Sequence, residues 1–338
     1  MHLIKRNYIR QILSMLIYLF LIFWSMALIA SPLRQEIRQF IDEMVAQHGF
    51  NQSKLEDIFN RVQFQPTIID LISVPASSIP WNKYRDRFIN PQRIKSGVNF
   101  WNEHAQKLEQ ASQVFGVPAE IIVAIIGVET AYGTTTGKHR VIDALTTLAF
   151  DFPRRADFFK SELEQYLLLA QEQNFDLFSI RGSYAGAIGF PQFMPGSYRR
   201  YAIDFDGDGK TDLASNATDA IGSVANYLKE YGWEAGGPTI ARAHIPIGSN
   251  HYQEILLAGI EPIHPIKKLR AANIIPLEKT GDERLAALIE LKDDDTLQYW
   301  LGFQNFYVIT RYNRSTFYAM SVLQLAEAIR AARNSSLR

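Results

Sequence analysis

The chain has 338 residues, of which 47% are hydrophobic and 21% charged, so it is long enough for about two folded domains and is not a disordered chain. Lys plus Arg and Asp plus Glu both number 35, which gives no net charge and argues against nucleic-acid binding and against electrostatic docking on anionic lipid. Cys is absent, which excludes disulfides, thiolate zinc sites, Cys nucleophiles and lipid attachment through an N-terminal Cys.

The N-terminus has the pattern of an export signal. Lys5, Arg6 and Arg10 precede an apolar run over residues 12–30, and a basic start followed by an apolar core is typical of a secretory signal. The run is also close to the minimum length for crossing a bilayer, so an uncleaved anchor stays open. We expect residues 1–30 to form a signal peptide or a membrane anchor, and the rest of the chain to be exported.

The next stretch, residues 31–113, is predicted to be a helical N-terminal region. Apolar residues over 36–47 lie on one face of an amphipathic helix that ends at Gly49. Prolines then divide the chain into short helices and loops. A further helix is expected over 97–114, with four apolar side chains facing inward: Val98, Trp101, Leu108 and Val114.

Residues 114–235 are predicted to form the core. The segment AEIIVAIIGVET follows Pro118 and is apolar on every face from Ile121 to Val128, which indicates a buried helix or a buried strand. Pro118 at the start and Glu120 in the first turn favour the helix. The other elements expected here are helices over 154–173 and 217–231, and an irregular, tightly packed stretch over 181–197.

The C-terminal part is predicted to hold a small β-containing module and a closing helix. Short apolar runs among Pro and Gly over 236–302 indicate the module. A strand over 285–291 and a turn over 293–295 are expected to lead to a second strand over 303–311. A helix over 315–332 closes the chain, and we expect residues 303–338, as strand and helix, to complete a cleft. The predicted fold class is therefore α+β, mainly α.

Glu129 ends the apolar helix and is a candidate general acid. A carboxylate at the mouth of an apolar helix loses solvation, which raises its pKa, and a protonated acid near neutral pH is what cleavage of a glycosidic bond requires. From the local pattern alone, a Glu129 that faces solvent or pairs with a nearby cation is the simpler interpretation. The stretch 181–195 adds Ser183 and Gln192 among small residues, which suits close approach to a ligand or a structural turn equally.

An acidic loop over 204–212 matches the first nine positions of an EF-hand loop. Its candidate Ca²⁺ ligands are Asp204, Asp206, Asp208, the carbonyl of Lys210, and Asp212. Ser215 stands at the twelfth position in place of a bidentate Glu, and Asp219 could close the site from a lengthened loop. A solvated acidic turn without metal is the alternative. A bound Ca²⁺ would be structural and not catalytic, because it stabilises the metal-bound fold and no His or Glu joins the cluster in sequence.

Five strings, in order along the chain, resemble the lytic murein transglycosylase B family. They are GVPAEIIVAIIGVETAYG, DALTTLAFDFPRRADFF, GSYAGAIGFPQFMPGSY, DAIGSVANYL and NFYVITRYNRSTFYAM. The resemblance implies a lysozyme-like catalytic core that cleaves the glycan strands of peptidoglycan between N-acetylmuramic acid and N-acetylglucosamine. In that family a single Glu of the V-E-T string acts as acid and then as base, while the muramoyl C6 hydroxyl attacks C1 and gives a 1,6-anhydro sugar. The matching residue is Glu129.

The same resemblance implies a saccharide cleft and a variant Ca²⁺ loop. From the export signal we expect a periplasmic protein, soluble after cleavage or held at the inner membrane by residues 12–30. The matching substrate-binding residues are Ser183, Gln192, Phe193, Met194, Tyr227, Tyr312, Asn313 and Tyr318, with Tyr84 in a region that matches less well. An ordinary glycosidase needs a second carboxylate, and none lies in the 183–197 string. Three acidic residues stay open as that partner: Asp143, Asp151 and Glu162.

Other functions stay open beside the lytic transglycosylase. A hydrolytic muramidase would use the same acid with water as acceptor, and a catalytically silent peptidoglycan-binding or scaffolding protein would need no buried acid. A calcium-responsive regulator is not supported by a single lengthened loop without a paired EF-hand. We expect peptidoglycan glycan strands as the partner, no nucleic acid, and membrane contact only through residues 12–30 if they are uncleaved. Without Cys, the chain is not a lipoprotein.

Overall fold

The computed structural model describes residues 33–73, 79–249, 252–294 and 296–336. These residues belong to two compact units, one ending at Gln63 and one beginning at Phe64, and each is described by itself. The predicted signal or anchor over 1–30 lies outside the described residues. The expected division of the chain at residues 113, 235 and 302 stays a prediction.

The first unit contains a pair of helices, α2 (Gln35–His48) and α3 (Gln52–Arg61). Helix α2 ends at Gly49, which adopts the left-handed conformation with φ 69° and donates its N–H to the carbonyl of Val45. The two helices pack through Phe40 and Phe59, whose ring centroids lie 5.9 Å apart in an edge-on arrangement. The amphipathic helix predicted over 36–47 is therefore confirmed.

The second unit begins with short helices, and one of them corrects the sequence prediction. The single helix expected over 97–114 is two helices, α6 (Pro91–Glu103) and α7 (Ala105–Phe115). The break lies at His104, whose backbone leaves the helical region at φ −110° and ψ 22° and whose ring packs 4.5 Å from that of Phe100. Val114, near the end of α7, is 60% exposed and does not face inward, whereas Leu108 in the same helix is fully buried. The remaining helices before α6 are α4 (Pro66–Ser73) and α5 (Trp81–Arg85).

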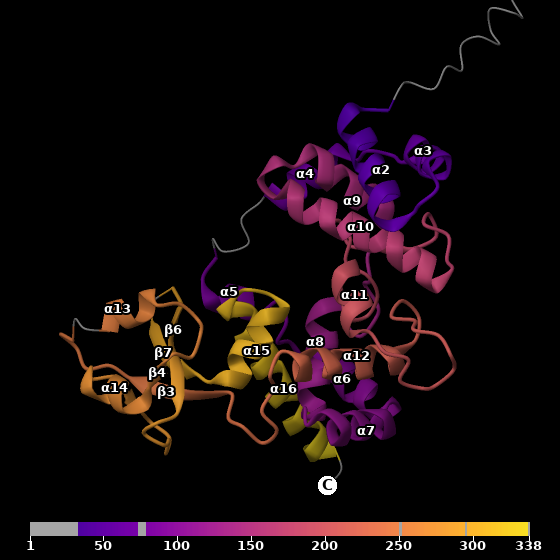
Figure 1. Ribbon diagram of the computed structural model, residues 1–338. Helices are drawn as coiled ribbons and strands as arrows, with labels where there is room; N and C mark the ends of the chain where they lie inside the picture. The colour runs from indigo at the N-terminus through magenta and orange to yellow at the C-terminus, as the bar shows by residue number, and fades with distance from the viewer. Residues whose placement is uncertain (1–32, 74–78, 250–251, 295, 337–338) are drawn as a thin grey trace, which may run out of the picture. The chain divides into compact units, whose positions relative to one another are not determined.

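Helix α8 (Ala119–Thr130) is the centre of this unit. Its residues from Ile121 to Val128 are all buried, so the helix favoured by Pro118 and Glu120 is confirmed. It packs against the closing helix α16 (Thr316–Ser336) and also contacts α6, α7 and α12 (Ala217–Glu230), as Figure 1 shows. An all-apolar helix is stable here because every face meets another helix.

A second group of helices follows α8 in the sequence. Helix α9 (Val141–Asp151), the short η1 (Pro153–Arg155) and α10 (Ala156–Gln173) pack together, and α10 contacts α11 (Pro195–Tyr201). Strand β1 (His139–Arg140) pairs with β2 (Arg181–Gly182) in a two-stranded sheet. Apart from β2 and the first residues of α11, the stretch 181–197 is irregular, as predicted, with isolated bridges that join Ile188 to Gly182 and to Phe193.

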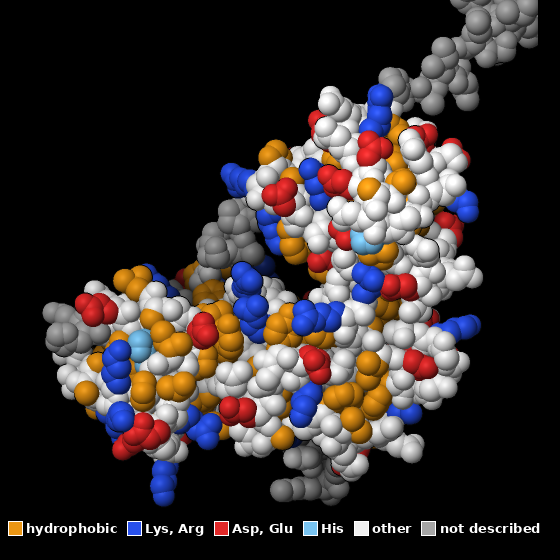
Figure 2. Space-filling model, in the orientation of Figure 1, with side chains coloured by type: hydrophobic (Ala, Val, Ile, Leu, Met, Phe, Trp, Pro, Cys, Tyr) orange, Lys and Arg blue, Asp and Glu red, His pale blue; other side chains and the backbone are white. Residues whose placement is uncertain are grey.

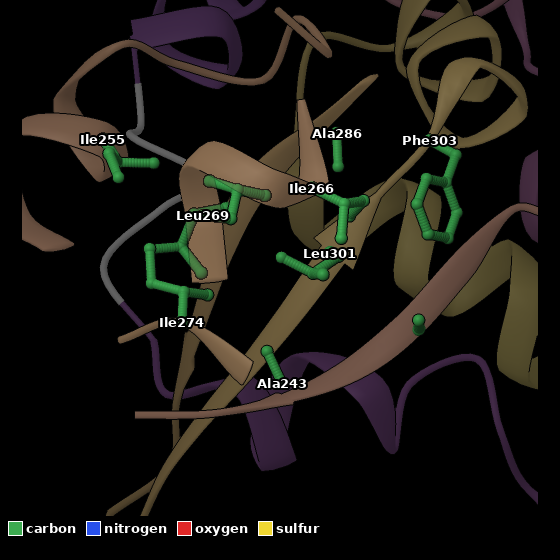
Figure 3. Packing of buried hydrophobic residues seen from close by; sticks show 10 residues of the cluster. Ala243, Ile255, Ile266, Leu269, Ile274, Ala286, Leu301 and Phe303 are labelled. Carbon is green, nitrogen blue, oxygen red and sulfur yellow. The ribbon is translucent and has the colours of Figure 1, made fainter. Parts of the chain in front are cut away.

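The small β module has a five-stranded antiparallel sheet in the order β4-β6-β7-β3-β5. Its elements are β3 (Ile240–His244), α13 (Tyr252–Leu257), β4 (His264–Pro265), α14 (Ile266–Ala271), β5 (Ile275–Pro276), β6 (Leu285–Lys292) and β7 (Leu297–Gly302). Figure 3 shows its core, in which Ile266 and Leu269 of α14 face Leu301 of β7 and Ile274. Apolar side chains on one face of the sheet are thereby covered by short helices of the same module.

The strand expected over 303–311 is wrong, because this segment is helix α15 (Gln304–Tyr312). The strand that pairs with β6 is β7, which lies directly after the predicted turn. Residues 303–311 contain aromatic and β-branched side chains that suit either structure, but Phe306, Ile309 and Thr310 are buried at helical spacing. The closing helix is confirmed as α16, and the predicted fold class, α+β and mainly α, is confirmed as well.

In the ranges that the structure describes, no single helix is long and apolar enough to cross a membrane; α7 and α8 together meet the length and composition, but they are bent by 113°. Helix α8 is moreover buried in the core. On the face drawn in Figure 2, Lys and Arg side chains are intermixed with Asp and Glu.

Candidate active site

Glu129 lies one residue before the C-terminal end of α8 and has the ionisation behaviour of a general acid. Its side chain is only partly exposed, and burial raises its pKa from 4.5 to about 7, opposed by a hydrogen bond that stabilises the carboxylate. The donor is the Tyr318 hydroxyl, 2.7 Å from Glu129 Oε1. At neutral pH, Glu129 is therefore present both with and without its proton.

The sequence positions Glu129 through the way in which α8 ends. Ala131 and Tyr132 adopt left-handed conformations with φ 51° and 62°, which terminate the helix directly after Thr130. The Thr130 hydroxyl donates to the carbonyl of Phe190 at 3.0 Å and accepts the N–H of Gly133 at 3.0 Å. Thr130 thus joins the end of α8 to the loop 181–197, a role that the sequence analysis did not assign to it.

Tyrosines from α12, α15 and α16 form a wall beside Glu129. The rings of Tyr312 and Tyr318 are nearly parallel, with centroids 6.3 Å apart, and Tyr312 lies 4.8 Å from Tyr227. The Tyr312 hydroxyl donates to the carbonyl of Pro191 at 2.6 Å, and the Tyr227 hydroxyl donates to that of Arg311 at 2.8 Å. Burial and the charge of Glu129 raise the pKa of Tyr312 and Tyr318 well above 10, so both hydroxyls remain donors.

The loop 181–197 supplies the other predicted cleft residues. Gln192 has φ 51°, a conformation that is uncommon for a residue with a side chain, and its Nε2 donates to the carbonyls of Thr136 and Gly189 at 3.0 and 2.8 Å. Phe193 is buried and packs against Tyr227, with ring centroids 5.4 Å apart, so it stabilises the group of tyrosines beside Glu129. Backbone strain at Gln192 that is held by two hydrogen bonds is typical of functional loops.

Three of the predicted cleft residues have looser surroundings. Met194 and Ser183 lie in the same loop and are partly exposed, and the Ser183 hydroxyl accepts the N–H of Ala187 at 3.1 Å. Asn313 follows the end of α15 and is exposed. The loop therefore offers polar groups at its surface, while Phe193 is buried beneath them.

Tyr84 comes to the site from α5 and is partly buried. Its ring lies 5.5 Å from that of Phe317, the neighbour of Tyr318 in sequence. Burial raises the pKa of Tyr84, and the charge of Glu129 raises it further, so the two side chains interact electrostatically. The charge of Glu129 thus raises the pKa of three predicted site residues, Tyr84, Tyr312 and Tyr318. Phe317, which links two of them, was not identified from the sequence.

The three acidic residues considered as a second catalytic carboxylate are either engaged by other groups or exposed. Asp143 is buried and its Oδ2 accepts from Arg140 Nε at 2.6 Å. Glu162 Oε2 accepts the N–H of Gly196 at 2.8 Å, and Asp151 is exposed at the last position of α9. Burial and Tyr318 are the influences that set the pKa of Glu129, and neither is a carboxylate.

The acidic loop brings three carboxylates together. Ligand atoms of Asp204, Asp206 and Asp219 lie within 4.8 Å of one another, with Asp219 buried in the first turn of α12. Asp219 also accepts the amides of Phe205 and Asp212, both at 2.8 Å, so it holds the loop to the helix. The other predicted ligands lie in the same loop, where Asp208 accepts the amide of Lys210 and Asp212 accepts those of Ala214 and Ser215.

Comparisons with known proteins agree with this geometry. A family described as transglycosylase SLT domain matches residues 32–327. The chain is 43% identical over 306 residues to membrane-bound lytic murein transglycosylase B of Escherichia coli K12, which covers 88% of this chain and 83% of that protein. Its structure is similar to soluble lytic transglycosylase SltB1 of Pseudomonas aeruginosa, with 48% identity, a TM-score of 0.83 and coverage of 88% of this chain and 99% of the other. It is also similar to lytic transglycosylase Slt35 of Escherichia coli in complex with calcium, with 43% identity, a TM-score of 0.80 and coverage of 88% and 94%.

These comparisons confirm the family resemblance and the lysozyme-like fold that the five strings imply. The matched region includes Glu129, the tyrosine wall and the acidic loop, so the residues that define the site lie inside the family's own boundaries. The chain therefore belongs to the transglycosylase SLT domain family.

Proposed function

We propose that the chain is a lytic transglycosylase that cleaves the β-1,4 bond between N-acetylmuramic acid and N-acetylglucosamine in peptidoglycan, without water and with formation of 1,6-anhydromuramic acid ends. The observation that carries this proposal is Glu129, a carboxyl group with a pKa of about 7 that is surrounded by tyrosines and hydrogen-bonded by one of them. The three similar proteins described above all carry the name lytic transglycosylase, and one of these names specifies murein.

Glu129 first acts as the acid. Its proton passes to the glycosidic oxygen as the bond from that oxygen to C1 breaks, which avoids expulsion of an alkoxide. A pKa of about 7 leaves a large share of Glu129 protonated at neutral pH. The Tyr318 hydroxyl stabilises the carboxylate that remains, because it donates a hydrogen bond to Oε1.

Glu129 then acts as the base. Its carboxylate takes the proton of the muramoyl C6 hydroxyl while the C6 oxygen forms a bond to C1, so the enzyme regains its proton and no water is consumed. This sequence of steps needs one carboxyl group, whereas ordinary retaining and inverting glycosidases use two at a defined separation. The engagement of Asp143 with Arg140 and of Glu162 with Gly196 supports the one-carboxyl route.

The cleft residues are proposed to hold the sugar rings. Aromatic faces pack on saccharides, and amide and hydroxyl groups bind their N-acetyl and hydroxyl groups. The proposed binding residues are Tyr84, Ser183, Gln192, Phe193, Met194, Tyr227, Tyr312, Asn313 and Tyr318. Since Phe193 and Tyr227 are buried, their contribution is to fix Tyr312 in place.

Mass spectrometry of purified peptidoglycan digested by the protein tests this function. Muropeptides that are lighter by one water than hydrolytic products, with 1,6-anhydro ends, are the expected result. Ordinary reducing ends would identify a hydrolytic muramidase, and the absence of soluble product from folded protein would identify a binding protein.

A matched pair of variants isolates the acid. Glu129→Gln is expected to bind glycan and to lose turnover, since the amide cannot supply a proton. Glu120→Gln changes the other Glu of α8, which lies 3.3 Å from Arg330, and is expected to keep activity. Turnover by Glu129→Gln at the wild-type rate would remove Glu129 from the mechanism.

The acidic loop is proposed to bind one structural Ca²⁺. Carboxylate oxygens are the ligands that Ca²⁺ prefers, and Asp204, Asp206 and Asp219 converge. Burial raises the pKa of Asp219, and the charges of Asp206 and Asp204 raise it further, so a cation among them would relieve this repulsion. A similar protein, Slt35, has been solved in complex with calcium. Asp208, Lys210 and Asp212 stay candidate ligands.

The location is proposed to be the cell envelope, in the periplasm. A similar protein is named as membrane-bound, and residues 12–30 of this chain have the sequence of an export signal. Cell fractionation followed by N-terminal sequencing of the mature protein distinguishes a cleaved signal from an anchor: a new N-terminus near residue 31 indicates cleavage, and Met1 in the membrane fraction indicates an anchor.

A further inference from the structure

The turn between β6 and β7 is hydrogen-bonded to the short helix α5. Asp293 Oδ1 accepts the backbone N–H of Asn82 at 2.9 Å, and Asp294 Oδ2 accepts from the Asn82 side-chain amide at 3.1 Å. Lys83 Nζ lies 4.0 Å from the same Asp294 oxygen. The Asn82 N–H is in the first turn of α5, where backbone amides have no partner within the helix. Asp293 therefore satisfies a group that α5 cannot satisfy itself.

The carboxylate of Asp293 is fixed from its own side. Its Oδ2 accepts from Gln298 Nε2 at 3.1 Å and from the Thr296 hydroxyl at 3.2 Å, and its N–H donates to the Thr296 carbonyl at 2.9 Å. Gln298 belongs to β7, which is paired along its length with β6. The sheet therefore determines where the Asp293 carboxylate points.

Helix α5 extends this contact to the active site. Trp81 is fully buried, and its ring lies 5.3 Å from that of Phe317, while Tyr84 lies 5.5 Å from Phe317 and 6.4 Å from Trp81. Phe317 directly precedes Tyr318, the donor to Glu129. A displacement of α5 would therefore move Tyr84 relative to Tyr318 before it moved Glu129 itself.

We propose that Asp293 is a positioning residue for the reaction: it fixes α5, and through α5 it holds Tyr84 against Phe317 at the wall of the cleft. This assigns a function in substrate binding to the small β module. The inference rests on the proposed function in one respect, namely that Tyr84 contacts the glycan.

The test compares Asp293→Ala, Tyr84→Ala and the double variant of the full chain, with purified peptidoglycan as substrate. Asp293→Ala is expected to raise the apparent KM about three- to tenfold, with kcat within about twofold, because a binding group is displaced while the acid stays in place. The double variant is expected to be no worse than Tyr84→Ala, since Asp293 acts through Tyr84. Asp293→Asn keeps an oxygen that accepts the Asn82 N–H, and its KM is expected to be close to that of the wild type.

A control variant separates positioning from a general loss of stability in the module. Glu283→Ala breaks an exposed ion pair with Lys267, 2.7 Å apart, in the same module and is expected to leave KM unchanged. Hydrogen–deuterium exchange of α5 supplies a readout that needs no activity: exchange is expected to rise in Asp293→Ala and not in Glu283→Ala.

Three results would overturn the proposal: unchanged exchange in α5, additive effects of Asp293→Ala and Tyr84→Ala on kcat/KM, or a loss of kcat in Asp293→Ala without a change of KM. Failure of the proposed function is distinguishable from these, because the wild type would then release no anhydro products while the exchange measurement still reports whether Asp293 holds α5.

Discussion

The raised pKa of Glu129 predicts that replacing this carboxyl group by an amide stabilises the protein in alkaline solution. In the folded protein the pKa is about 7, whereas the ordinary value is 4.5, so the folded state binds an additional proton between these two pH values. The contribution of a group whose acidic pKa is raised is fully favourable below pH 4.5 and is lost as pH rises through about 7. Glu129→Gln removes this loss, because the amide is neutral at every pH.

The magnitude follows from the two pKa values. A difference of about 2.5 pKa units corresponds to about 3 kcal/mol of unfolding free energy, at about 1.4 kcal/mol per unit. The amide oxygen of Gln can still accept from Tyr318, so the variant keeps the hydrogen bond now made by Glu129 Oε1. We therefore expect Glu129→Gln to be more stable than wild type at pH 8 by up to about 3 kcal/mol, and equally stable at pH 4.

The assay is thermal unfolding of both proteins at pH 4, 6 and 8 and at one fixed Ca²⁺ concentration. The difference in Tm should be near zero at pH 4 and should grow through pH 6 to pH 8. Glu120→Gln, in the same helix, controls for the general effect of exchanging Glu for Gln. A gain that is the same at all three pH values, or a variant that is less stable at pH 8, would refute the assignment of the raised pKa to burial.

Four further predictions concern Tyr318, the loop 181–197, the acidic loop and Glu162. Tyr318→Phe removes the donor that lowers the pKa of Glu129, so the alkaline limb of the pH–rate profile should move to higher pH by about one unit, as the profile of kcat/KM will show. Gln192→Ala loses two hydrogen bonds and should cost about 1–3 kcal/mol in thermal unfolding, together with a fall in kcat/KM on peptidoglycan. Asp219→Asn should abolish the rise of Tm on adding Ca²⁺. In the wild type, a free Ca²⁺ concentration of 100 times the Kd should raise the unfolding free energy by about 2.7 kcal/mol. Glu162→Gln should keep the hydrogen bond to Gly196 and activity within about twofold, measured as initial rate.

The central helix could be predicted from sequence because it depends on local features. The segment from Ile121 to Val128 is apolar on every face, which indicates burial, and Glu129 follows it directly. Loss of solvation raises the pKa of a carboxyl group unless a cation or hydrogen-bond donors offset it. The local pattern by itself nevertheless favoured a Glu129 that faces solvent or pairs with a cation, and the family resemblance is what favoured the acid.

Other parts of the site could not be predicted because they depend on contacts between distant residues. Tyr318 is 189 residues from Glu129, and nothing in its own segment indicates that its hydroxyl donates to the acid. Residues 303–311 were misassigned because aromatic and β-branched side chains suit a strand, while burial of Phe306 and Ile309 selects the helix α15. The break at His104 was missed for a similar reason, since no Pro or Gly marks it.

Glu129 and Glu162 show why burial alone does not identify a catalytic acid. Burial raises the pKa of both carboxyl groups, and both accept one hydrogen bond that opposes this effect. The partner of Glu162 is the backbone N–H of Gly196, which has a fixed place at the start of α11. The partner of Glu129 is a tyrosine hydroxyl, which can turn toward another acceptor when Glu129 gains its proton. In the proposed mechanism Glu129 is protonated in one step and ionised in the next, and a hydroxyl donor such as Tyr318 can adjust to both states.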